Sequence, residues 1–152
     1  MSRPIPSPDR VPLIRIVDLV NRAMQNDMVS TARSLGWTGV TYAHNAVFST
    51  LQVEGSRASD MAAAAGITRQ SMGEIIRGLV ALGLVEMQAD PDDKRAKVVA
   101  YTPLGVECAR QGFQHIVDLE KRFSEEFGED YETARRVLSR VVEILVEESD
   151  DD

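Results

Sequence analysis

The stretch RASDMAAAAGITRQSMGEIIRGLVAL, residues 57–82, contains two helical patterns separated by a glycine. Its alanine run strongly favours a helix, and Ser59 followed by Asp60 would supply an N-cap and a first-turn acid. Gly66 is the kind of residue that ends a helix, and Thr68 can cap a second helix after a short turn. The apolar side of the second helix is formed by Met72, Ile75, Ile76, Leu79 and Leu82. This pattern predicts a helix-turn-helix.

The segment that follows predicts a β-hairpin. Gly83 ends the second helix, and two β-prone segments come after it, LVEMQ at 84–88 and KVVAY at 97–101. Between them lies a charged tip, DPDDKRA at 90–96. A hairpin directly after a helix-turn-helix makes a winged helix, and the charged segment is then the tip of the wing.

Two helices are predicted before this unit. Apolar residues recur at spacings of three and four over residues 13–35, and this helix should end near Gly36. Thr41 can cap a second helix over residues 41–55, which has one apolar side.

Two more helices are predicted after the wing. Thr102 and Pro103 form a cap and first-turn pair for a long helix that Gly128 breaks, and Asp130 can cap the last helix. The expected fold is mainly α-helical: a winged helix-turn-helix with a two-stranded β-hairpin wing and long terminal helices. The apolar stripes of the terminal helices exceed what one small core can cover, so we expect these helices to form the dimerisation region of a homodimer.

The composition fits one globular domain, since the 152-residue chain is 43% hydrophobic and 27% charged. Its formal net charge of −7 argues at first sight against a polyanionic partner. Residues 55–101, however, hold six basic and six acidic side chains, so the negative excess lies in the flanks. The acidic end, EESDDD at 147–152, has the composition of a solubilising tail.

The sequence lacks the motifs of several other functional classes. No apolar run approaches the ~20 residues of a membrane span and no signal peptide is recognisable, so we expect a cytoplasmic protein without membrane contact. Cys108 cannot form an internal disulfide and is expected to be an inert core thiol. Lys94 and Arg95 follow Asp90, Asp92 and Asp93 at the positions where a calcium loop would need further oxygen ligands. Without a catalytic motif either, we expect no enzyme, no metal and no cofactor.

The order of predicted elements over nearly the whole chain resembles the MarR family of bacterial transcription regulators, and the match is strongest over residues 57–105. The family pattern is met by Asp60–Ala62, Ile67–Thr68, Gln70–Ser71, Gly83–Val85, Asp90–Pro91, Asp93, Arg95–Ala96, Thr102 and Gly105. The resemblance implies a homodimer with interlocked first and last helices, in which each winged helix binds half of a near-palindromic operator. Many such regulators respond to a small phenolic or aromatic ligand between the dimer region and the DNA-binding lobe, and some respond to oxidants through cysteine.

The resemblance also divides the chain into regions. We expect a single MarR-like domain over residues 11–147, between a disordered arm at 1–10 and an acidic tail at 148–152. Inside this domain we expect a DNA-binding lobe at 55–102 and dimerisation helices at 11–36 and 104–147.

The second helix of the helix-turn-helix is the expected recognition helix. Its solvent side carries Arg69, Gln70, Ser71, Glu74 and Arg77. Residues near the N-terminus of such a helix can reach base edges in the major groove, where Arg69 suits guanine and Gln70 suits adenine. Thr68 and Arg57 complete the candidate DNA contacts of the helical part. The alternative interpretation is an ordinary solvated helix face.

The wing tip supplies the remaining candidate DNA contacts. A hairpin that projects an arginine toward a narrow minor groove gains from the negative potential there. The resemblance gives this role to Arg95, and it implies that Asp93 steadies the arginine side chain with a salt bridge. Lys94 and Lys97 would then contact phosphates. Without the helix-turn-helix before it, a mixed-charge tip would indicate only a soluble turn.

Trp37, Tyr42 and His44 lie where the first two predicted helices meet, the region that borders the ligand pocket in the family. They are the candidates for binding a small aromatic effector. The alternative is hinge packing, since a lone tryptophan at a helix junction is more often part of the core.

We therefore expect a homodimeric transcription regulator that binds double-stranded DNA. It would act as a repressor at a pseudo-palindromic operator and be released by a small aromatic ligand. The alternative is a winged-helix module that binds protein, without sequence-specific DNA binding, since winged helices are reused as protein adaptors. The two differ in whether the basic residues of the recognition helix and wing gather on one surface.

Overall fold

The computed structural model describes residues 10–150, with the backbone only for residues 148–150. The expected disordered arm at 1–10 and acidic tail at 148–152 therefore fall largely outside the described residues. The chain divides into two compact units, Met1–Gly112 and Phe113–Asp152. No helix in the described part of the chain is long and apolar enough to cross a membrane.

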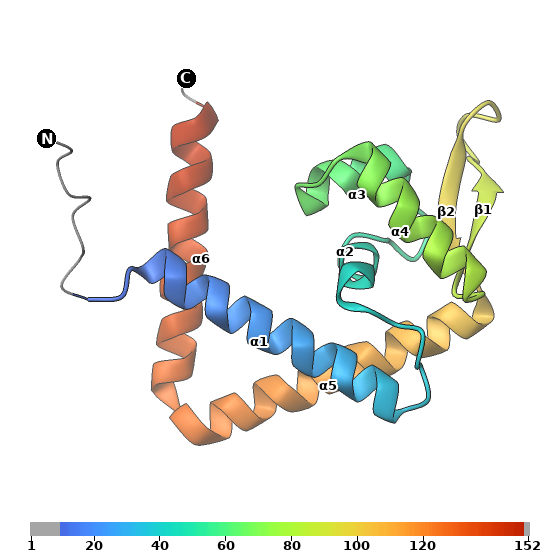
Figure 1. Ribbon diagram of the computed structural model, residues 1–152. Coiled ribbons are helices and arrows are strands. Elements are labelled where there is room, and N and C mark those ends of the chain that lie inside the picture. The colour runs from blue at the N-terminus through green and yellow to red at the C-terminus, as the bar shows by residue number, and fades with distance from the viewer. Residues whose placement is uncertain (1–9, 151–152) are drawn as a thin grey trace, which may run out of the picture. The chain divides into compact units, whose positions relative to one another are not determined.

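The first unit contains the winged helix, and its elements follow the order that the sequence predicts (Figure 1). They are α1 (Leu13–Ser34), the 3-10 helix η1 (Tyr42–His44), α2 (Asn45–Phe48), α3 (Ala58–Ala65), α4 (Arg69–Ala81), β1 (Val85–Ala89), β2 (Lys97–Tyr101) and the start of α5 (Pro103–Phe127). The rest of α5 and α6 (Glu129–Asp150) form the second unit. The mainly helical fold with a two-stranded wing is confirmed.

The helix-turn-helix has the turn chemistry that its sequence predicts. Gly66 ends α3 with a left-handed φ of 66°, a conformation that costs glycine little. Thr68 caps α4, because its hydroxyl oxygen accepts a hydrogen bond from the backbone N–H of Ser71 at 3.0 Å. The start of α3 differs from the prediction: Arg57 is its N-cap residue, and Ser59 lies inside the first turn.

The wing is an antiparallel hairpin whose pairing runs from Val85 opposite Tyr101 to Ala89 opposite Lys97. A third segment joins its edge, because Ser56 exchanges two backbone hydrogen bonds with Val99, at 3.0 and 2.8 Å. The loop just before α3 is therefore attached directly to β2.

One hydrophobic core joins the helices and the wing. Its fully buried side chains come from α2, α3, α4, β1 and β2, and the largest of them are Met61, Met72, Leu79, Val47, Val85 and Val99. Of the apolar side predicted for α4, Met72, Ile76 and Leu79 are buried in the core and Ile75 is partly buried, and the opposite side is left for solvent. Leu82 differs from the prediction: it is the C-cap residue and is 38% exposed.

The predicted second helix over residues 41–55 is wrong in extent. Only η1 and the four-residue α2 form there, and the helix stops at Phe48. The Thr50 hydroxyl donates to the carbonyl of Ala46 at 2.6 Å, so at this end a side chain supplies the hydrogen bond to a carbonyl of the helix. The chain then turns toward β2 through Gly55, whose φ is 94°. The helical periodicity of residues 49–55 is weak, so the helix ends at Phe48 and the chain leads to Ser56, which pairs with β2.

The second unit contains the end of α5 and the whole of α6. Gly128, with φ 55°, separates the two helices, and α6 begins at Glu129, so Asp130 lies in its first turn rather than at the predicted cap. The turn is packed by aromatic rings, with the centroid of Phe123 at 6.2 Å from that of Tyr131. Many apolar side chains of this unit stay exposed, among them Phe113, Phe127, Val137, Val142 and Val146.

The first turn of α5 packs closely on the backbone of Leu84, the residue just before β1. Thr102 caps this helix, since its hydroxyl oxygen accepts from the N–H of Gly105 at 3.0 Å. A Cβ added to Gly105 would lie 1.7 Å from the carbonyl oxygen of Leu84, so only glycine fits this contact.

Gly105→Ala should lower the free energy of unfolding by about 3 kcal/mol, because the new methyl group forces α5 away from the backbone of Leu84. Gly112→Ala on the same helix is the matched control. Its nearest neighbour would be the Met28 methyl group at 3.6 Å, an ordinary contact, so we expect no loss or a gain of about 0.5–1 kcal/mol. Chemical denaturation of both variants measures this, and equal stabilities would contradict the close packing.

Candidate nucleic-acid interface

The polar side of α4 is free to meet a partner. Arg69, Gln70, Ser71, Glu74 and Arg77 are all exposed, while Met72, Ile76 and Leu79 of the same helix are buried. The hydroxyls of Thr68 and Ser71 bond to each other at 2.8 Å inside the N-terminal cap. The Gln70 amide lies 3.4 Å from a Glu74 carboxylate oxygen. The arginines at either end of this side are its positive groups.

In the described part of the chain, the basic residues of α4 and the wing have no acidic partner within ion-pair distance, a property shared in the long helices only by Arg33, Arg122 and Arg136. Among the described residues, Arg69, Arg77, Lys94, Arg95 and Lys97 form no ion pair. Most basic residues of the long helices are paired, for example Arg110 with Glu107 at 2.7 Å and Arg135 with Glu120 at 3.0 Å. The helix-turn-helix and wing therefore present positive charge that no described carboxylate neutralises.

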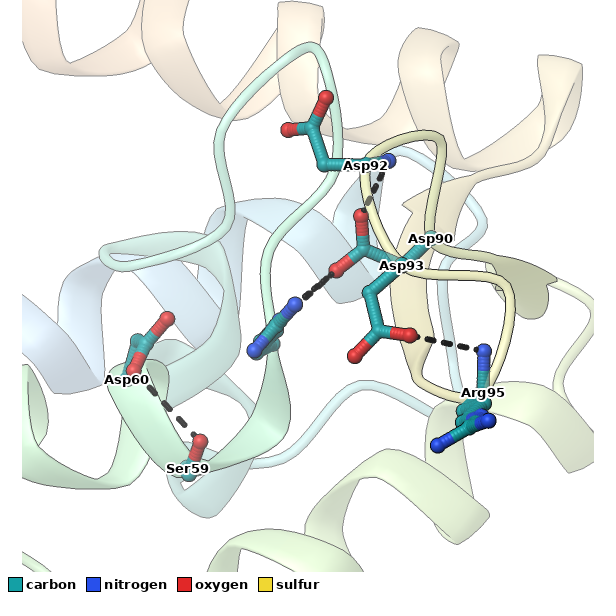
Figure 2. A network of polar contacts seen from close by, with 7 residues as sticks. Ser59, Asp60, Asp90, Asp92, Asp93 and Arg95 are labelled. Carbon is teal, nitrogen blue, oxygen red and sulfur yellow. Dashed lines mark hydrogen bonds and ion pairs between the residues drawn. The ribbon is translucent and has the colours of Figure 1, made fainter.

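Asp93 organises the turn at the tip of the wing (Figure 2). Its carboxylate accepts a hydrogen bond from the backbone N–H of Arg95 at 3.0 Å, and its carbonyl accepts from the N–H of Ala96 at 2.8 Å. The side-chain salt bridge expected between Asp93 and Arg95 does not form within the described structure. An aspartate bonding the backbone two residues ahead is the usual geometry of such turns, so Asp93 orders the backbone and leaves the guanidinium free.

An ion pair that the sequence interpretation missed joins the loop at the tip of the wing to α3. Asp90 lies where β1 ends, and its Oδ2 is 2.6 Å from Nη2 and 2.7 Å from Nε of Arg57. Its Oδ1 accepts from the backbone N–H of Asp92 at 2.9 Å (Figure 2). The Asp90 side chain is only 6% exposed, against 44% for Arg57. Arg57, predicted as a DNA contact, is thus set apart from the unpaired bases.

The hydrogen bonds to Asp90 favour its ionised form. The N–H of Asp92 and then the guanidinium of Arg57 hold the pKa of the Asp90 carboxyl below its usual range. The same pair raises the pKa of Arg57. One sequence signal pointed to this role: Asp90 stands directly before Pro91 at the end of a predicted strand, where a carboxylate commonly bonds to turn backbone.

A groove of about 400 Å³ lies beside this ion pair, between the loop at residues 50–56, α3 and the tip loop of the wing. The carboxylates on its walls belong to Glu54, Asp60, Asp90 and Asp92. This lining is unsuited to a phosphate. The described residues also include no group of three or more His, Cys, Asp or Glu placed to hold a metal ion.

Trp37, Tyr42 and His44, the candidate effector contacts, have separate surroundings. The Trp37 indole N–H donates to Gln111 of α5 at 2.9 Å, and Tyr42 is 45% exposed. His44 is buried, and its Nδ1 accepts from the backbone N–H of Thr41 at 3.1 Å. Burial lowers the pKa of His44, in keeping with a neutral ring. Trp37 and His44 thus have the contacts expected of hinge packing, and their effector role stays a prediction.

Cys108 occupies the core position that the sequence predicts for it. It is 5% exposed and packs in the same apolar cluster as the winged helix. Burial raises the pKa of its thiol to about 11, which keeps the sulfur protonated at neutral pH.

Comparisons with known proteins agree with this architecture. Residues 38–96 match the MarR family. Among solved structures, wild-type MarR from E. coli is 20% identical over 88% of this chain and 98% of that one, with a TM-score of 0.66. The transcriptional regulator SlyA is 14% identical over 91% and 96%, with a TM-score of 0.73. A mutant of S. aureus MepR bound to an oligodeoxyribonucleotide is 17% identical over 90% and 99%, with a TM-score of 0.55. At these identities the likeness shows the fold alone, and no curated protein matches the sequence.

Asp90→Asn should change how stability depends on pH. A carboxyl with a lowered pKa in the folded state stabilises the fold above its unfolded pKa, about 4, and this contribution is lost as pH falls through the folded pKa. Since asparagine does not titrate, the variant should be less stable at pH 7 and lose less stability on acidification to pH 3. Denaturant unfolding at both pH values measures this, with Asp92→Asn as a control that should match the wild type at pH 7.

Proposed function

We propose that this protein, whose residues 38–96 match the MarR family, regulates transcription by binding double-stranded DNA. The observation that carries the proposal is the set of bases without acidic partners in α4 and the wing: Arg69, Arg77, Lys94, Arg95 and Lys97. They belong to the two elements with which winged helices meet the major and minor grooves. Arg69 and Gln70 would meet base edges, and the lysines would meet phosphates.

The acidic net charge of the chain is compatible with this role because the charge is unevenly distributed. Residues 113–152 carry thirteen acidic and five basic side chains, which is more than the whole formal charge of −7. Residues 1–112, which include the winged helix, therefore have a slight positive excess. Attraction to DNA depends on the field at the binding surface rather than on the total charge.

We propose further that the regulator is a homodimer. Exposed apolar side chains cover α1, including Ile14, Val17 and Val20, and others cover α6, including Val137 and Val142. Such faces are unfavourable in water and are commonly covered by a second copy. A two-fold dimer would present two winged helices, which matches a pseudo-palindromic operator. A monomer at micromolar concentration in sedimentation equilibrium would contradict this.

Repression and release by a ligand complete the proposal. A dimer that occupies an operator in the bacterial cytoplasm would act as a repressor by excluding the transcription machinery. Trp37 contacts α5, and His44 lies against Gly78 of α4, so an aromatic ligand binding there would act on the recognition helix. Salicylate should quench Trp37 fluorescence and weaken operator binding together, since linkage is reciprocal. Quenching without any change in operator affinity would exclude regulation by this route.

Selection of binding sites from random duplex DNA tests the function directly. We expect enrichment of a motif with two-fold symmetry. The winged-helix protein-interaction module remains the competing function, and it predicts no enriched sequence. In that case, binding should be weak, equal for all duplexes and abolished by moderate salt.

Arg95→Ala should weaken operator binding by about 1–3 kcal/mol per subunit, because the guanidinium is free to enter the minor groove. The loss should depend on the A·T content of the positions that face the wing. Lys97→Ala is the contrasting variant: as a phosphate contact it should weaken all duplexes alike and lower the slope of log K against log salt by about one unit. Titration against operator and scrambled duplexes at several salt concentrations separates the two roles. Equal losses on every duplex for Arg95→Ala would remove its minor-groove role.

A further inference from the structure

We propose that Arg57 and Asp90 are positioning residues for the wing, and that their ion pair acts on DNA through Arg95 without touching DNA itself. The pair joins the N-terminus of α3 to the end of β1. This inference rests on the proposed function, because the orientation of the wing matters to DNA binding only if the wing meets DNA.

Two neighbouring residues hold the hairpin at two separate points. Ser56 bonds the backbone of Val99 in the middle of β2, and Arg57 holds the carboxylate of Asp90 at the end of β1. A single attachment lets a hairpin rotate about that point, whereas two attachments set its direction. The backbone pairing with Val99 requires no particular side chain, so the second attachment is the one that depends on the identity of its residues.

Hydrogen bonds connect Asp90, which is paired with Arg57, to the residues around Arg95 in the tip loop of the wing. Besides accepting from the N–H of Asp92, Asp90 donates its own N–H to the carbonyl of Ala96 at 3.1 Å. Ala96 donates to the carbonyl of Asp93, whose carboxylate accepts from the N–H of Arg95. Figure 2 shows Asp90, Asp92, Asp93 and Arg95 close together in this loop. A chain of hydrogen bonds therefore links the ion pair to the backbone that carries the Arg95 side chain.

Arg57 is poorly suited to binding phosphate itself. Its Nε and Nη2 both lie within 2.7 Å of one Asp90 oxygen, so its charge is already neutralised. Glu54, Asp60 and Asp92 line the groove beside it and would repel a phosphate. Arg95 and Lys97, in contrast, have no acidic partner in the described part of the chain.

The test compares Asp90→Asn, Arg57→Gln and Arg57→Lys in the wild-type chain and in the Arg95→Ala background. Asp90→Asn should weaken operator binding about tenfold, as much as loss of a wing arginine, although it makes the protein more positive. Arg57→Gln should do the same, and Arg57→Lys should restore part of the affinity. In the Arg95→Ala background all three should have little further effect, because the residue that they position is gone.

Glu125→Gln is the matched control. It removes one carboxylate from the exposed pair with Lys121 on α5, at 3.8 Å, and so makes the same change in charge away from the wing. We expect unchanged affinity for this control. Tighter binding by Asp90→Asn, or equal losses with and without Arg95, would overturn the proposal. A lower salt slope for Arg57→Gln with no effect of Asp90→Asn would overturn it too, since Arg57 would then be a direct phosphate contact.

A second measurement without DNA separates this inference from the proposed function. Amide hydrogen exchange of Asp90→Asn should accelerate more at Asp92, Arg95 and Ala96 than at core amides such as Leu79, which report only the loss of global stability. Unchanged exchange in the wing loop would overturn the positioning role whatever the DNA results. If the wild type selected no DNA sequence while Asp90→Asn still exchanged faster in the wing loop, the proposed function would be wrong. The conclusion that the ion pair orders the wing loop would remain valid.

Discussion

A hairpin of two five-residue strands is not stable alone in water, so the wing depends on being docked onto the helices. Val85 and Val99 provide the docking, since both are buried against Met61, Met72 and Leu79 of α3 and α4. The same contacts bury the apolar side of α4 and leave its polar side exposed. Helix α4 and the wing are therefore positioned together by one core, and a change that loosens either would displace the other.

The ion pair between Arg57 and Asp90 has a different physical role from the core. Bringing a carboxylate out of water opposes the attraction between the charges, so such pairs contribute little net stability, while their geometry can select one arrangement of the chain. Asp90 has its oxygens bonded to Arg57 and to the backbone of Asp92. The core holds the strands of the wing in place, and the ion pair holds the loop between them.

The distribution of charge explains how an acidic chain can have a DNA-binding surface. In the long helices most basic residues form ion pairs with neighbouring carboxylates, as Arg15 and Arg22 do with Asp18. Exposed pairs of this kind add little stability, but they cancel charge locally. In α4 and the wing, carboxylates are also present, yet the Asp93 carboxylate bonds to the backbone N–H of Arg95, and Asp90 bonds to Arg57. The remaining bases keep their charge available to a partner.

The sequence alone determined the order of the elements and the boundaries where glycine and caps act, because Gly66, Thr68 and Thr102 work through contacts within a few residues. It also determined which side of α4 is buried, since a helical period fixes which residues share a face. Only the tertiary structure decided that the helix ends at Phe48 and that Ser56 pairs with β2, and that Arg57 is neutralised by Asp90, 33 positions away. These contacts depend on how distant segments meet, and no local pattern encodes that meeting.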